Sequence, residues 1–129
     1  MNNRTLQYAA ISGALAVIIG AFGAHALKPH LSDYQIDIYE KGVQYQFVHT
    51  LAMLFAGLLP LASGRFALWA QRFFLAGIVC FSGSLYLLAC RELLPFPVAW
   101  VGPVTPLGGL AFIGGWISLL IGFRKSKQA

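Results

Sequence analysis

The chain has 129 residues, of which 58% are hydrophobic and only 10% are charged. Soluble domains contain about 25% charged residues, so this composition excludes an ordinary soluble domain and indicates an integral membrane protein. The length fits a single domain covering residues 1–129. The formal net charge is +5, but the Lys and Arg residues lie between or just outside the apolar runs and form no basic stripe. They therefore indicate membrane topology and contact with the lipid bilayer, and no nucleic-acid partner is expected.

The first apolar run, residues 6–27, contains no Asp, Glu, Lys or Arg. Its end, Ala24-His25-Ala26, is similar to a signal-peptide cleavage site, but a secretory h-region has only about 7–15 apolar residues. About 20 residues cross a bilayer, so we predict a retained transmembrane helix over residues 6–27. Small residues on one face of this helix are expected to pack against the other helices, whereas His25 projects beside the lipid-facing side.

Residues 28–41 form a charged connector, in which Pro29 ends the first helix. Ser32 followed by Gln35 is a capping-box pattern that predicts a short amphipathic helix from about Asp33. This helix either lies on the membrane interface and bends near Gly42 into the second span, or forms a solvated helical loop. The second span is predicted over residues 44–62, with His49 on its small-residue face, toward the bundle.

A third span is predicted over residues 72–90, after a short connector that begins at Arg65 and places Trp69 at the interface. Three prolines exclude a regular helix from residues 91–105. Thr105-Pro106 is typical of a helix start, so the fourth span is predicted over residues 106–123.

The third span contains two hydroxyl side chains and two cysteines whose roles can be considered from their spacing. Ser82 and Tyr86 lie one turn apart and could hydrogen-bond across the bundle, although a packing role is the simpler interpretation. Cys80 and Cys90 are about 15 Å apart if they share one helix, which is too far for a disulfide. We expect both cysteines to be small packing residues.

The sequence thus predicts an all-α bundle of four transmembrane helices. Six Lys and Arg residues fall on one side of the membrane and three on the other, so the positive-inside rule places both termini in the cytoplasm. All acids and histidines then gather at the outer side. The acids are Asp33, Asp37, Glu40 and Glu92, and the histidines are His25, His30 and His49.

Four motifs carry a resemblance to a known family: residues 20–25 (GAFGAH), 42–49 (GVQYQFVH), 81–86 (FSGSLY) and 105–109 (TPLGG). Together they resemble the domain of unknown function 423 family. That family comprises small four-helix proteins of bacterial inner membranes, similar to transmembrane protein 256 of animals. The resemblance covers nearly the whole chain and implies fold and location, but it implies no activity.

An imidazole inside an apolar span is costly to bury without a polar partner, so His49 heads the candidate site. We expect an outer polar cluster of His49, Tyr45, His25, Glu40 and Gln46. In one interpretation His49 is structural, with its ring nitrogens bonded to Tyr45, to a backbone carbonyl on the first helix, or to a carboxylate. In a second, His25 and His49 lie at similar depth and hold a transition metal or haem. In a third, Glu40 and His49 line a shallow, outward-facing polar pocket.

The chain has no pattern typical of a hydrolase triad, a phosphate-binding loop or a local metal motif, so the sequence does not favour an enzyme. The leading hypothesis is a non-enzymatic accessory or small-ligand-binding component of the bacterial inner membrane, without a cofactor. Its small-residue faces are compatible with self-association or with a membrane-protein partner. The alternatives are a haem- or metal-binding redox protein that uses His25 and His49, and a small proton-linked transporter.

Overall fold

The structure, a computed structural model, describes residues 1–60 and 64–127, and all regular secondary structure in these residues is helical. Two short segments are turns of π-helix, and three are turns of 3-10 helix. The α-helices are α1 (Asn3–Phe22), α2 (Asp33–Leu58), α3 (Arg65–Gly77), α4 (Gly83–Ala89) and α5 (Val104–Ser126). The short turns are η1 (Gly23–Leu27), η2 (Lys28–His30), η3 (Ile78–Ser82), η4 (Arg91–Leu93) and η5 (Ala99–Val101).

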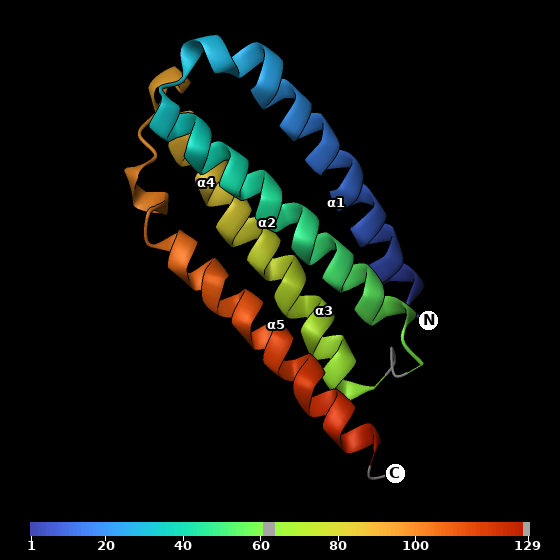
Figure 1. Cartoon of the computed structure of the whole chain (residues 1–129). Helices are drawn as coiled ribbons and strands as arrows, with labels where there is room; N and C mark the ends of the chain where they lie inside the picture. The colour runs from blue at the N-terminus through green and yellow to red at the C-terminus, as the bar shows by residue number, and fades with distance from the viewer. Residues whose placement is uncertain (61–63, 128–129) are drawn as a thin grey trace.

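The helices form four rods that lie side by side in chain order, each antiparallel to the one before (Figure 1). The rods are α1, α2, the continuous run of α3, η3 and α4, and α5. The N-terminus and the end of α5 lie at the same end of the bundle (Figure 1). The segment that carries η4 and η5 lies at the other end, beside the start of α2 (Figure 1).

Within the part of the chain that the structure describes, three helical stretches are long and apolar enough to cross a membrane, namely Asn3–His30, Arg65–Ala89 and Ala99–Ser126. Their outward side chains are largely aliphatic or aromatic, as a lipid-facing surface requires. The prediction of an all-α membrane protein is therefore confirmed. The rod α2 does not have this continuous hydropathy, because polar residues interrupt its apolar ones.

Glycines set how closely the rods approach. A Cβ added to Gly108 of α5 would overlap the backbone nitrogen of Phe81 in η3, so two backbones meet there. Gly115 similarly leaves room for the ring of Phe74, which is completely buried. Close contact between small residues is how helices associate in lipid, where the hydrophobic effect gives them no reason to pair.

The structure corrects the predicted start of the second rod. The capping box is present, with the Ser32 side chain accepting from the Gln35 N–H and the Gln35 side chain accepting from the Ser32 N–H. From Asp33, however, one helix runs without interruption to Leu58, so the amphipathic helix and the second span are a single element. Gly42 packs closely here, because an added Cβ would lie 2.7 Å from the Tyr86 ring. Residues 61–62, the predicted end of this span, lie outside the described residues.

Two further boundaries differ from the prediction. The predicted connector between Arg65 and Trp69 is the start of α3, because buried alanines on its inner face, such as Ala67, already pack into the bundle. The last rod begins at Val104, with Pro106 within the first turn, where a missing N–H is tolerated. The Thr105 hydroxyl bonds the Ser84 hydroxyl at 2.6 Å instead of capping the helix.

We predict opposite results for two glycine-to-alanine changes. Gly108→Ala should lower the free energy of unfolding by about 1–3 kcal/mol, because the added methyl group forces two backbones apart. Gly83→Ala should be neutral or stabilising by up to about 1 kcal/mol, because nothing lies within 4 Å of the added carbon and alanine favours helix. Unfolding of both variants by SDS in mixed micelles measures this difference. Equal effects would contradict the close approach at Gly108.

Candidate functional site

Several polar side chains of α2 point into the bundle. A series of its buried residues is spaced alternately four and three residues apart: Gln35, Tyr39, Gly42, Gln46, His49, Met53 and Ala56. This is the period of a helix that presents one seam to its neighbours. The spacing is visible in the sequence, and it identifies the inward face even though that face carries amides and an imidazole.

Gln46, which is only 4% exposed, joins three rods. Its Nε2 donates to the Ser12 carbonyl of α1 at 3.0 Å, and its Oε1 accepts from the Tyr86 hydroxyl of α4 at 2.6 Å. One turn further along α2, the Thr50 hydroxyl bonds the Ser12 hydroxyl at 2.6 Å. A side-chain amide is costly in an apolar interior, so these bonds fix both the depth and the rotation of α2.

Ser82 and Tyr86 both hydrogen-bond across the bundle. The simpler interpretation, in which they only pack, is therefore not sufficient. The Ser82 hydroxyl donates to the Gly42 carbonyl at 2.7 Å, while Tyr86 donates to Gln46. Cys80 and Cys90 are free, as predicted.

A second buried amide, Gln71, holds the opposite end of the bundle. Its Oε1 accepts from the Thr5 hydroxyl at 2.6 Å and from the Asn2 amide at 2.9 Å. Its Nε2 donates to the Ala56 carbonyl at 3.2 Å. The sequence prediction missed Gln71, because it assigned that residue to a connector.

His49 uses both ring nitrogens inside the protein. Its Nδ1 lies 2.8 Å from the Tyr45 carbonyl, and the Trp116 indole N–H donates to its Nε2 at 3.2 Å. Indole is only a donor, so Nε2 accepts, and the neutral ring carries its proton on Nδ1. The ring also stacks on Phe112 of α5, with centroids 3.5 Å apart. This geometry favours the structural interpretation, with the Tyr45 carbonyl and an indole from α5 as partners.

His25 does not meet His49, so the structure does not support the interpretation in which the two histidines lie at similar depth. His25 is exposed in η1, close to Gly23, which packs against the Tyr39 ring. Tyr39 precedes His49 by ten residues, or about 15 Å along α2. Within residues 1–60 and 64–127, no group of three or more His, Cys, Asp or Glu could hold a metal ion. The arrangement therefore gives no support to a shared haem or metal site.

Glu40 and His49 line two different hollows. Glu40, with Lys28 and Gln44, lines a groove of about 300 Å³ between the end of α1 and the start of α2, which we call the Lys28–Glu40 groove. His49 and Tyr45 line a shallow hollow of about 370 Å³ beside Trp116. Gln44 lines both, so the hollows are neighbours on one face of α2.

The Lys28–Glu40 groove lies beside apolar surface. A Cβ added to Gly20 would lie 3.3 Å from Val43, which places this part of α1 level with the second to fourth turns of α2. There the outward side chains of α1 include Ile18 and Phe22, which are 62% and 56% exposed. On α2 the outward side chains at this depth are polar or charged: Glu40, Lys41 and Gln44. Two adjacent helices thus differ sharply in polarity at one depth.

The family model named protein of unknown function, DUF423, matches residues 19–109. The chain belongs to this family. It is 40% identical over 128 residues to a UPF0382 membrane protein of Haemophilus influenzae, covering 99% of each chain. It is also 40% identical over 126 residues to the UPF0382 inner membrane protein YgdD of Escherichia coli, covering 95% of this chain and 91% of the relative. No solved structure matches the chain.

The first prediction for the site concerns Gln46. Gln46→Leu should lower the free energy of unfolding by about 1–2 kcal/mol, because two bonds between rods are lost. Gln44→Leu, a matched change on the exposed face, should stay within about 0.5 kcal/mol of the wild type. In a double-mutant cycle with Tyr86→Phe, the coupling energy should be about 0.6–1.7 kcal/mol. A coupling energy of zero would show that the hydrogen bond between Tyr86 and Gln46 does not contribute to stability.

The second prediction concerns the tautomer of His49. Because Trp116 donates to Nε2, nitrogen NMR of selectively labelled histidine should show a neutral ring protonated at Nδ1. Trp116→Phe removes the donor and should shift the Nε2 resonance, whereas Trp100→Phe should leave it unchanged. A ring protonated at Nε2 would contradict this geometry.

Proposed function

We propose that all four rods cross the bacterial inner membrane, with both termini in the cytoplasm. Three rods are apolar enough to do so, and α2 has 26 residues, or about 39 Å of helix. Its low hydropathy comes partly from buried polar residues that are hydrogen-bonded inside the bundle, such as Gln46 and His49, and partly from exposed charged residues near its start. The six to three distribution of Lys and Arg supports the orientation, and the name of the Escherichia coli relative supports the location.

We propose further that the protein is a non-enzymatic ligand-binding component that holds a zwitterionic amphiphile in the Lys28–Glu40 groove. The observation that carries this proposal is the charged surface of α2 at the depth where α1 is apolar. Charged groups at hydrocarbon depth are costly unless a partner compensates them. A headgroup that carries both an ammonium and an acidic group supplies partners to both charges.

The lining of the groove suits such a ligand. The Glu40 carboxylate can accept from an ammonium, and the Lys28 ammonium can pair with a phosphate or carboxylate. Ala24 is a small, exposed residue in the η1 wall of the groove, and Ile36 and Val43 offer apolar contact for a chain. This assigns Glu40 a role in binding, while Gln46 and His49 hold the bundle together.

The alternatives have less support. A redox role needs a free imidazole nitrogen on His49, but both nitrogens are engaged. Proton-linked transport usually relies on carboxylates that face the interior of the bundle, whereas all four acids of this chain are exposed on its outer surface.

We predict that a photoactivatable lysophosphatidylethanolamine in phosphatidylcholine nanodiscs crosslinks to peptides from residues 20–44. Glu40→Gln and Lys28→Gln should each reduce this crosslinking at least about tenfold, because each removes a hydrogen bond to a charged group. Mass spectrometry of the crosslinked peptides measures the yield.

The matched controls are Asp37→Asn and Lys41→Gln, which remove the same charges from exposed positions of α2 outside the groove lining. Both should retain wild-type crosslinking. Equal losses in the control variants, or no loss in Glu40→Gln, would overturn the proposal.

A further inference from the structure

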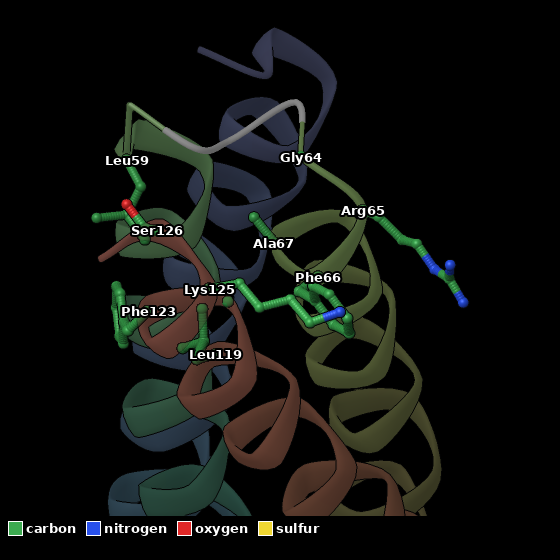
Figure 2. A pocket seen from close by; sticks show the side chains of 10 residues that line it. Leu59, Gly64, Arg65, Phe66, Ala67, Leu119, Phe123, Lys125 and Ser126 are labelled. Carbon is green, nitrogen blue, oxygen red and sulfur yellow. The ribbon is translucent and has the colours of Figure 1, made fainter. Parts of the chain in front are cut away.

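A separate hollow lies at the opposite end of the bundle. It has a volume of about 240 Å³ and lies between the start of α3 and the end of α5, with Leu59 of the segment after α2 at its edge (Figure 2). Leu59 directly follows α2 and comes nineteen residues after Glu40. At the rise of an α-helix this separation is about 28 Å. The hollow is therefore remote from the Lys28–Glu40 groove.

The walls of this hollow are apolar, but its rim is cationic. Phe66, Leu119 and Phe123 contribute to the walls, while Arg65 and Lys125 contribute to the rim. Lys125 extends toward Phe66, with its Nζ 4.8 Å from the ring centroid, and Arg65 points outward from the start of α3 (Figure 2). The first turn of α3 also lines the hollow, so the positive end of its helix dipole adds to the same field.

No aspartate or glutamate is available to neutralise this rim. The four acids of the chain are Asp33, Asp37 and Glu40 in the first turns of α2, and Glu92 in η4. The start of α2 and the segment that carries η4 lie at the far end of the bundle (Figure 1). The charge of the rim is thus complementary to an external anion.

We propose that this hollow binds one anionic phospholipid, with its phosphate at Arg65 and Lys125 and one acyl chain against Phe66 and Phe123. A free phosphate ion would gain nothing from the apolar walls, and a neutral lipid would gain nothing from the cations. Basic pockets at the ends of transmembrane helices suit anionic headgroups for this reason. The site is independent of the proposed function, because it uses other residues at the other end of the bundle.

Native mass spectrometry of the full chain from phosphatidylcholine nanodiscs doped with phosphatidylglycerol tests this proposal. One phosphatidylglycerol should be retained in preference to phosphatidylcholine. Lys125→Gln and Arg65→Gln should each weaken its binding about fivefold, the loss expected for one cation near a headgroup. Phe123→Ala should weaken it as well, because the acyl chain loses a wall of the hollow.

Each variant has a matched control outside the hollow lining. Arg124→Gln, Arg72→Gln and Leu120→Ala remove an equivalent side chain from the same helix and should leave binding within about twofold of the wild type. Equal weakening of phosphatidylglycerol binding in the control variants would show that the lipid is attracted to the basic surface as a whole. That result would contradict a specific site in the hollow. Displacement of the lipid by millimolar inorganic phosphate, or equal retention of phosphatidylcholine, would also overturn it.

Discussion

The structure depends on one constraint, which is that the polar side chains of α2 must find partners inside an otherwise apolar bundle. Every buried side-chain nitrogen and oxygen of the described residues has a hydrogen-bond partner. Gln46 binds α1 and α4, Gln71 binds α1 and α2 from α3, and His49 is bonded by Trp116 of α5. Because hydrophobicity alone does not order helices in lipid, these bonds and the glycine contacts define one arrangement of the rods.

This constraint separates structural polar residues from those available for binding. On the inner seam of α2, Gln46 and His49 are hydrogen-bonded to groups of the same chain, which favours a structural role for both. Charged residues on the outer surface gather at the two ends, with acids at one end and a cationic rim at the other. The two proposed sites therefore lie toward opposite ends of the bundle, and both use charge that the bundle itself does not neutralise.

The sequence predicted the all-α membrane fold, the capping box at Ser32 and the family, because apolar runs and local motifs determine these features. It did not predict the partners of buried groups. Trp116 and His49 are 67 residues apart in the chain, so their bond depends on packing that no local pattern encodes. Gln71 was missed because a helix is hard to distinguish from a connector where charged and aromatic residues mix. The sequence left open whether His25 and His49 meet, because the relative depth of two helices depends on how they pack. In the structure, Gly23 near His25 lies against Tyr39, ten residues before His49.

The central claim is that α2 crosses the membrane with the seam that carries Gln46 and His49 turned inward. Cysteine labelling tests it most directly, with Tyr34→Cys before the crossing and Arg65→Cys after it, in a chain whose Cys80 and Cys90 are replaced by alanine. Both positions are exposed in the structure. The account predicts that an impermeant maleimide labels Tyr34→Cys in intact cells and labels Arg65→Cys only after permeabilisation. Labelling of both positions from the same side would contradict it.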